Sequence, residues 1–180
     1  MSQDKSPDQS VKRIAITGAG SGLGRAIALR YARAGWHVAV TDLQTTRAQS
    51  VAEEIEQAGG TALVQTLDTR READFDQLMS RLQTEWGGID VFVNNAGVAL
   101  VGTLEENSLE DLEWLVGVNF WGVVYGCKFF LPFLQKEDEA HIINISSLAG
   151  LTGVPGLGVY SATKAAVRSW TESLSAELRG

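Results

Sequence analysis

The alternation of short β-branched runs with longer helical repeats constrains the fold more than any other feature of this chain. Strands are expected over five apolar runs, at residues 13–17, 37–41, 61–66, 90–95 and 141–146. Helices are expected where apolar residues recur at helical spacing, over about residues 23–34, 45–58, 71–86, 109–134 and 158–179. Because strands that alternate with helices pair in parallel through right-handed crossovers, we predict an α/β fold with a doubly wound, mostly parallel sheet and helices on both faces.

The composition is typical of one soluble domain. Of the 180 residues 44% are hydrophobic, and the absence of a run of about 18 apolar residues predicts no membrane partner. The polar residues 1–10 lack the apolar segment of a secretory signal, so we expect a flexible tail there and a single domain over residues 11–180.

Charge and cysteine content exclude several classes of function. The 15 Lys and Arg against 22 Asp and Glu give a net charge of -7 without a basic cluster, which argues against nucleic acid as a partner. Cys127 is the only cysteine, and His37 and His141 are far apart, so neither a disulfide framework nor a zinc motif can be written. We therefore expect no metal site and a cytoplasmic location.

A glycine-rich turn, "TGAGSGLGR", follows the first expected strand and opens the first helix. Gly18, Gly22 and Gly24 give the spacing G-x-x-x-G-x-G, which differs from the dinucleotide pattern G-x-G-x-x-G. Glycines at this place allow a tight turn and let a pyrophosphate approach backbone N–H groups at the positive end of the helix. A nucleotide site and a plain tight turn both fit, whereas a Walker-type loop is excluded because no Gly-Lys-Ser/Thr follows.

Asp42 closes the second expected strand, where an acid binds the adenosine ribose hydroxyls in this type of sheet. A carboxylate would repel a 2′-phosphate, and the neighbouring Ser21 and Leu43 supply no cation. NAD(H) is therefore favoured over NADP(H), although Arg25 and Arg47 are cations nearby. The alternative is that Asp42 only forms the turn at the strand end.

Tyr160 and Lys164 lie four positions apart in "GVYSATKAAV", which places them on one face of the last expected helix. A phenol has a pKa of about 10, so it transfers protons at neutral pH only if a cation stabilises the phenolate. Lys164 is a candidate for that cation. An exposed polar pair on a helix surface is the alternative.

Taken in order, these segments resemble the short-chain dehydrogenase/reductase family from about residue 11 to the end of the chain. The resemblance is carried by "TGAGSGLG" at 17–24, "NNAG" at 94–97, "VNFWG" with Asn119, "NISS" with Ser147, and "YSATK" with Tyr160 and Lys164. It implies a Rossmann-type fold that binds a nicotinamide cofactor. The residues that it places at the cofactor are Gly18, Ser21, Gly22, Leu23, Gly24, Asp42, Leu43, Asp68, Thr69, Asn95, Ala96, Gly97, Tyr160 and Lys164.

The resemblance also implies an enzyme that transfers a hydride between NAD(H) and a secondary alcohol or ketone. Tyr160 would be the acid and base, and Lys164 would stabilise its phenolate and reach the nicotinamide ribose. Ser147 would hydrogen-bond the substrate oxygen, and the adjacent Ser146 would point to the opposite side. Asn119 would hold a water that links Lys164 to solvent, unless its side chain is simply satisfied by backbone bonds.

The chain departs from the family at its end, because members continue beyond the last helix with more strands and a substrate-covering loop. The domain is thus expected to be truncated at its C-terminus, and the substrate cannot be named. Two other functions stay open: a nucleotide-sugar epimerase or dehydratase, disfavoured by the glycine spacing, and a non-catalytic dinucleotide-binding or sensing module.

The long expected helix over 109–134 is apolar around much of its circumference, and its aromatic residues include Trp114, Phe120, Trp121, Tyr125, Phe129 and Phe130. A helix that only covers a sheet needs one apolar stripe. A second buried surface is therefore expected, and we predict a homo-dimer or homotetramer.

Overall fold

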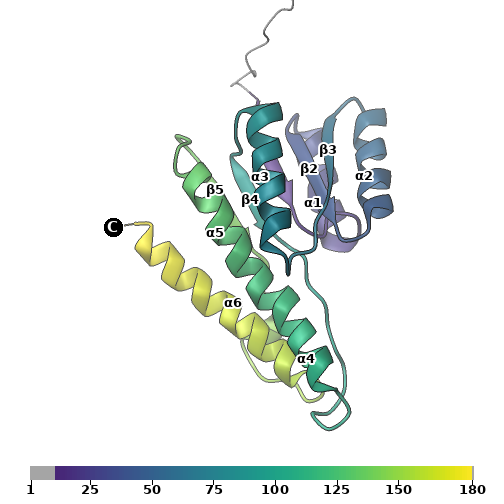
Figure 1. Ribbon diagram of the computed structural model, residues 1–180, viewed down its shortest axis with the longest axis vertical. Coiled ribbons are helices and arrows are strands. Elements are labelled where there is room, and N and C mark those ends of the chain that lie inside the picture. Colours follow the sequence, from purple (N-terminus) through teal and green to yellow (C-terminus); the bar gives the residue numbers. More distant parts are fainter. Residues whose placement is uncertain (1–10, 180) are drawn as a thin grey trace, which may run out of the picture.

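The computed structural model describes residues 11–179; the tail expected over residues 1–10 lies outside this range. A single sheet of five parallel strands has the order β3-β2-β1-β4-β5 (Figure 1). The strands are β1 (Arg13–Ile16), β2 (His37–Asp42), β3 (Thr61–Thr66), β4 (Val91–Asn94) and β5 (His141–Asn144). This arrangement confirms the predicted fold class.

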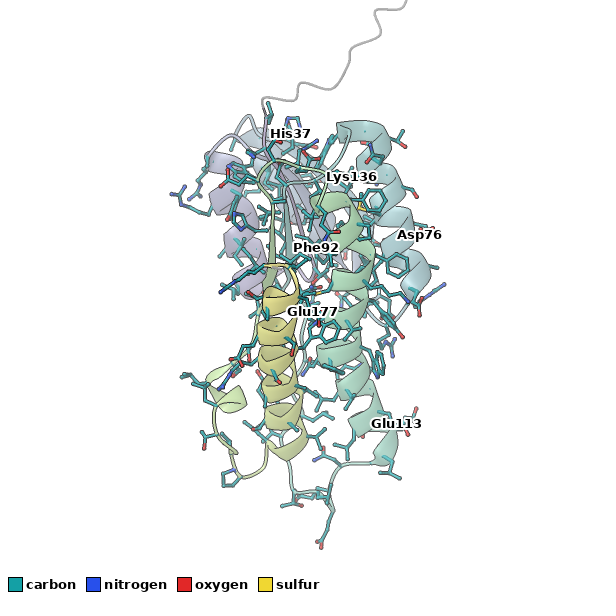
Figure 2. The ribbon with its side chains drawn as sticks, turned by 90° about the vertical axis from the view of Figure 1, so that its left-hand side faces the viewer. His37, Asp76, Phe92, Glu113, Lys136 and Glu177 are labelled. Atoms are coloured by element: carbon teal, nitrogen blue, oxygen red, sulfur yellow. The ribbon has the colours of Figure 1, made fainter. Side chains whose placement is uncertain are left out.

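Helices follow each strand, as the alternation predicts. They are α1 (Gly22–Arg33), α2 (Thr45–Gln57), α3 (Glu72–Trp86), α4 (Leu109–Val116), α5 (Gly122–Leu134) and α6 (Gly158–Glu177). One apolar cluster joins α1 and α2 to one face of the sheet, and another joins α3 and α5 to the opposite face. Helix α6 packs beside α5, as the views in Figures 1 and 2 agree.

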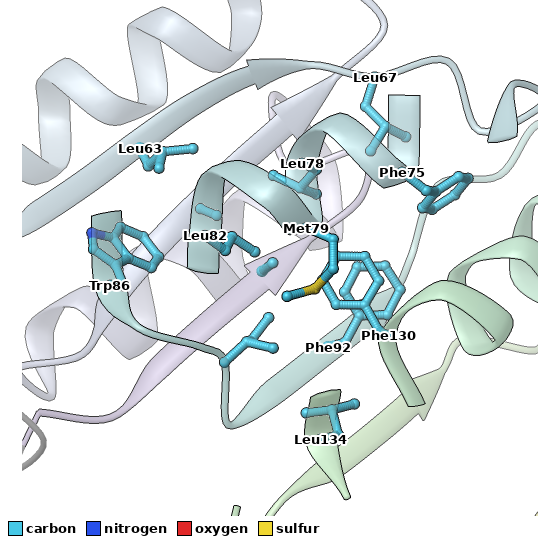
Figure 3. Packing of buried hydrophobic residues seen from close by; sticks show 13 residues of the cluster. Leu63, Leu67, Phe75, Leu78, Met79, Leu82, Trp86, Phe92, Phe130 and Leu134 are labelled. Carbon is cyan, nitrogen blue, oxygen red and sulfur yellow. The ribbon is translucent and has the colours of Figure 1, made fainter. Parts of the chain in front are cut away.

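The central strands are buried on both faces because their side chains alternate between the two clusters. Ile14 and Ile16 of β1 pack with α1 and α2, whereas Ala15 faces α3 and α5. The small Ala15 leaves room on its face for aromatic rings, and Phe92 of β4 stacks on Phe130 of α5 with ring centroids 3.8 Å apart (Figure 3).

Strands β4 and β5 are shorter than predicted, ending at Asn94 and Asn144 rather than at 95 and 146. Ile145 still donates to the carbonyl of Asn94, but the other residues bond elsewhere: Asn95 through its side chain to the turn after β1, and Ser146 to α6. These side-chain bonds replace the strand pairing that the apolar pattern alone would continue.

The single α-helix predicted over about 109–134 is instead interrupted by a π-helical turn, Gly117–Trp121, between α4 and α5. This turn contains Asn119, whose side chain hydrogen-bonds the backbone of Val98 in the loop after β4. Single π turns inside α-helices are frequent at functional sites.

The helical segment Leu109–Leu134 is long and apolar enough to cross a membrane, by length and composition alone. In the structure it lies between α3 and α6, and buried residues of its α5 part pack in the clusters formed with the sheet and with α6. The core helix of a soluble protein meets the same criterion. The absence of a membrane partner stays a prediction.

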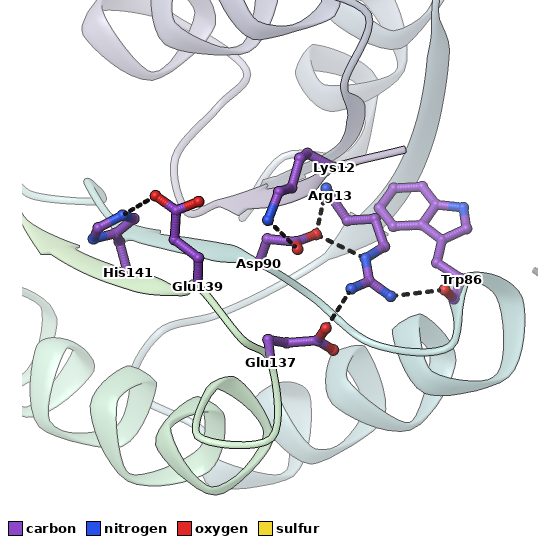
Figure 4. A network of polar contacts seen from close by, with 7 residues as sticks. All are labelled: Lys12, Arg13, Trp86, Asp90, Glu137, Glu139 and His141. Carbon is purple, nitrogen blue, oxygen red and sulfur yellow. Dashed lines mark hydrogen bonds and ion pairs between the residues drawn. The ribbon is translucent and has the colours of Figure 1, made fainter. Parts of the chain in front are cut away.

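A buried ion network lies at the amino edge of the sheet, next to the starts of β1 and β4 (Figure 4). Asp90 accepts hydrogen bonds from the backbone N and the Nε of Arg13, at 2.7 and 2.8 Å, and pairs with Lys12 at 3.3 Å. Arg13 also pairs with Glu137 at 3.0 Å. Burial alone would raise the pKa of Asp90, but the hydrogen bonds and charge of Arg13 outweigh it and hold that pKa below its usual value.

We expect Asp90→Asn to lower the free energy of unfolding at pH 7 by about 3 kcal/mol, because the buried Arg13 loses the charge of Asp90 and keeps only its pairing with the more exposed Glu137. A carboxyl with a depressed pKa stabilises fully above its unfolded pKa of about 4, and that stability is lost as pH falls through the folded value. Urea unfolding between pH 3 and 7 measures both effects. The exposed Glu139, 3.9 Å from His141, is the control, and equal losses for Asp90→Asn and Glu139→Gln would contradict the assignment.

Candidate active site

A cleft of about 470 Å³ opens at the carboxyl edge of the sheet, between the loops that follow β1, β2, β3 and β4. Crevices at this edge are where doubly wound sheets bind ligands. Eleven of the residues predicted to contact a cofactor line it: Gly18, Ser21, Gly22, Leu23, Asp42, Leu43, Asp68, Thr69, Asn95, Ala96 and Gly97. Lining residues that the sequence analysis missed include Gln44, Leu67, Arg70, Val98, Trp114 and Val118.

Gly24 does not line the cleft, in contrast to the prediction. It is buried under the turn, where any Cβ would overlap the carbonyl of Gly18. Gly18 and Gly22 have φ angles of 64° and 52°, a region that L side chains rarely adopt. The glycines therefore divide their roles: two shape the turn, and Gly24 lets the helix approach it.

The turns after β1 and β4 are joined by side-chain hydrogen bonds. Thr17 Oγ1 accepts from the backbone N–H groups of Asn95 and Ala96, each at 3.0 Å. Asn95 Nδ2 donates in return to the carbonyls of Thr17 and Gly18, at 2.9 and 3.2 Å. Asn95 therefore orients the glycine turn as well as lining the cleft.

Asp42 is 8% exposed, and both of its carboxylate oxygens accept backbone hydrogen bonds. Oδ2 accepts from Gly20 N at 3.1 Å, and Oδ1 accepts from Gln44 N at 3.0 Å. The carboxylate is thus held at the edge of the cleft, and its remaining lone pairs can accept hydrogen bonds from a ligand. Arg47 also lines the cleft and takes part in none of the ion pairs of residues 11–179, whereas Arg25 pairs with Glu54.

Asp68 carries a partner that sequence reasoning missed. Arg70 donates to its two carboxylate oxygens, at 3.0 Å from Nε and 2.6 Å from Nη2. The hydrogen bond from Arg70 is the main reason that the pKa of Asp68 lies below its usual value. Asp68 therefore reaches this end of the cleft as one half of an ion pair.

Tyr160 and Lys164 lie one turn apart on α6, with Lys164 Nζ 6.0 Å from the centroid of the Tyr160 ring. The lysine is buried, and burial lowers the pKa of its ammonium group. Nζ donates a hydrogen bond of 3.0 Å to the carbonyl of Ile145, just beyond β5. Neither residue lines the 470 Å³ cleft, but Lys164 lies next to Gly97, which does. A Cβ added to Gly97 would lie 3.3 Å from Lys164 Nζ.

Ser146 and Ser147 have different hydrogen-bond partners, although both lie beyond β5, whose alternation was the basis for predicting opposite directions. Ser146 Oγ donates to the backbone carbonyl of Lys164 at 2.7 Å. Ser147 is half-buried and caps a short 3₁₀ turn, Leu148–Gly150, by accepting from Ala149 N at 3.2 Å. Gly150 presses on α6, where a Cβ would come within 2.7 Å of the Lys164 carbonyl carbon. Ser146 and Gly150 thus hold the Ser147 segment against Lys164.

Asn119 is fully buried, and its side-chain amide is used within the protein. Its Oδ1 accepts from Val98 N at 2.8 Å, while Nδ2 donates to Val98 O at 2.8 Å and to Thr163 Oγ1 at 3.3 Å. Both N–H donors of the amide are therefore engaged, and only an acceptor position on Oδ1 is left. The sequence analysis offered two roles for Asn119. This geometry is closer to an Asn whose side chain is satisfied largely by backbone hydrogen bonds than to one whose side chain holds a water.

Residues 12–180 match the family model described as short chain dehydrogenase. The chain belongs to the short-chain dehydrogenase family. The oxidoreductase family predicted from the sequence is thus confirmed.

Relatives of this short-chain dehydrogenase include two curated bacterial proteins. SadH of Mycobacterium tuberculosis, an oxidoreductase by name, is 37% identical over 163 residues, which are 91% of this chain and 59% of SadH. YdfG of Salmonella typhimurium, named an NADP-dependent 3-hydroxy acid dehydrogenase, is 37% identical over 168 residues, which are 93% of this chain and 66% of YdfG. The chain therefore spans about three fifths to two thirds of the length of these relatives.

Two solved structures resemble most of this chain. A short-chain dehydrogenase/reductase from Burkholderia phymatum in complex with NAD has a TM-score of 0.91 and 36% identity, covering 94% of this chain and 60% of that one. A metagenomic short-chain oxidoreductase in complex with NADP has a TM-score of 0.89 and 31% identity, covering 93% and 76%. The family thus includes structures with either cofactor.

We expect Gly150→Ala to destabilise this short-chain dehydrogenase by about 1–3 kcal/mol, because the added methyl meets the backbone of α6 and one of the two must move. Gly153→Ala, in the same loop, is the matched control, since its Cβ would meet nothing within 4 Å. Urea unfolding of both variants measures the difference. Equal stability of the two variants would show that Gly150 does not hold the loop on α6.

Proposed function

We propose that the protein is an NAD(H)-dependent oxidoreductase that interconverts a secondary alcohol and a ketone. The observation that carries this proposal is the set of contacts that hold the Ser147 segment against Lys164, one turn from Tyr160 on α6 and beside Gly97 at the border of the cleft. The name of YdfG supports the same chemistry, because a 3-hydroxy acid in general carries a secondary hydroxyl.

The cleft fits a dinucleotide. Its floor lacks side chains at Gly18 and Gly22, and the first backbone N–H groups of α1 lie beside it, which suits a pyrophosphate. Asp42 and Asp68 stand at the loops after β2 and β3, where the adenosine would lie. The bound nicotinamide would accept or supply the hydride.

Tyr160 would take the proton of the substrate hydroxyl during oxidation and return it during reduction. A phenol needs a nearby cation for this task at neutral pH, and Lys164 supplies the charge on the same helix face. Ile145 O occupies one donor of the ammonium, which leaves two for the cofactor ribose and for water. Ser147 Oγ would donate to the substrate oxygen, where negative charge develops.

Tyr160→Phe should leave NADH affinity nearly unchanged and lower turnover by about 10²–10⁴-fold, because a positioned acid–base group contributes that much. The ring and its packing stay, and only the ionisable hydroxyl is lost. Initial rates of NADH oxidation with a panel of ketones, together with NADH titration by fluorescence, measure the two effects. Tyr31→Phe, whose ring packs on Trp36, is the control. A Tyr160→Phe enzyme with most of its activity would refute the proposed mechanism.

The preference for NAD(H) rests on the Asp42 carboxylate, which is fixed by two backbone hydrogen bonds and would repel a 2′-phosphate. Arg47 acts in the opposite direction, since its cation lines the same part of the cleft. The carboxylate dominates in this proposal because it is anchored and buried at the strand end. Arg47 would then bind the 2′-phosphate of NADPH only when the Asp42 carboxylate is removed.

Asp42→Ser should therefore shift the ratio of NADPH to NADH affinity toward NADPH by about tenfold or more, equivalent to about 1.4 kcal/mol. Adding Arg47→Gln should cancel most of the shift. Fluorescence titrations of both cofactors on the parent protein and the two variants provide the measurement. If the parent protein binds NADPH more tightly than NADH, the preference is assigned the wrong way round.

We also propose a homo-dimer or homotetramer, built on the apolar surface of the helical segment 109–134. Leu109 and Trp121 are 78% and 49% exposed there, and Trp121 stacks on Tyr125 with centroids 6.0 Å apart. Burial of such a surface in a second copy would stabilise the assembly. Light scattering at micromolar concentration should give a multiple of the chain mass, and a monomeric mass would count against this surface.

A further inference from the structure

A second, smaller cavity of about 270 Å³ lies beside Tyr160, between the first turns of α4 and α6 and the loops that precede them. It shares no lining residue with the dinucleotide cleft. Tyr160 is the only proposed catalytic residue that lines it. The remaining lining residues are Leu100, Gly102, Leu104, Asn107, Leu112, Leu115, Gly156, Leu157, Gly158 and Val159.

The lining of this cavity is apolar. Apart from Tyr160, its only polar side chain is Asn107, whose Nδ2 already donates to the carbonyl of Thr103 at 2.9 Å. The nearby Glu106 accepts from the backbone N and the Oγ1 of Thr103, at 2.7 and 3.0 Å. The polar groups of this turn are thus bonded to one another, and no Lys, Arg or His within residues 11–179 lines the cavity.

Two glycines hold the loops together over this cavity. Gly102 N donates to Gly156 O at 2.9 Å, which ties the loop after β4 to the loop before α6. Both residues have positive φ angles, 157° and 74°, so side chains are disfavoured at either position. This backbone hydrogen bond holds together the two loops that carry Leu100 and Leu157. The apolar walls of the cavity are therefore in place before any ligand binds.

We propose that this cavity binds an uncharged, apolar substituent of the substrate. This substituent would be an alkyl or aryl group attached to the carbon whose oxygen exchanges a proton with Tyr160. This rests on the proposed function, because it takes Tyr160 as the proton donor. A carboxylate in the cavity would find no cation and would be buried without a partner, at a large free-energy cost. Each methylene placed there is instead removed from water.

The test compares straight-chain methyl ketones of increasing length on the full chain with NADH. kcat/KM should rise about fourfold for each added methylene until the cavity is full. A 3-oxo acid anion of matched length should react more slowly than the neutral ketone. Leu157→Phe, which fills the cavity, should remove the gain from longer chains, whereas Leu178→Phe, on an exposed residue outside the cavity, should keep it.

A binding measurement separates this subsite from the catalytic proposal. Primary aliphatic amides, which are not reduced by NADH, should bind the NADH complex more tightly by the same factor per methylene in calorimetry, and Leu157→Phe should abolish the trend. Absence of turnover with every ketone, combined with this trend, would refute the proposed reaction and leave the subsite standing. Affinity that is independent of chain length, or equal in the parent and Leu157→Phe, would overturn the subsite.

Discussion

Reciprocal hydrogen bonding between Lys164 and the segment after β5 is the contact on which the site depends. Ser146 Oγ binds the Lys164 carbonyl, and Lys164 Nζ binds the Ile145 carbonyl. The two bonds run in opposite directions between the same two segments, so neither α6 nor the β5 loop can slide without breaking both. The lysine is thereby held at a fixed position while its charge stays close to Tyr160.

A ladder of polar side chains extends this constraint to strands β4 and β5. Asn94 of β4 donates to Asn144 of β5 at 2.8 Å, and Asn144 donates to Thr171 of α6 at 2.9 Å. Cys127 of α5 lies against both asparagines at 3.6 Å. Because these buried amides are costly to leave unpaired, they select one arrangement of β4, β5 and α6. Stability of the sheet and alignment of α6 are therefore coupled.

Element types and order were predictable because the apolar period changes between two and about three and a half at each boundary. The cleft was predictable for a similar reason: its lining comes from strand ends, which parallel pairing brings to one edge. Arg70 beside Asp68 could have been found from the spacing of opposite charges two residues apart. The π turn at Asn119 could not, since it depends on a hydrogen bond to Val98, 21 residues away.

Some glycines have roles that the sequence pattern alone does not predict. Gly97, Gly126 and Gly150 all have ordinary backbone angles, so no turn preference marks them out from other small residues. Each faces a distant segment. A Cβ on Gly126 or Gly150 would overlap the Asn94 side chain or the backbone of α6, and a Cβ on Gly97 would crowd Lys164 Nζ at 3.3 Å. Two of these contacts involve Lys164, and the third involves the ladder that aligns its helix. The glycines of the glycine-rich turn thus serve the dinucleotide cleft, whereas Gly97, Gly126 and Gly150 lie outside that turn, at places where a close approach helps to position one buried lysine.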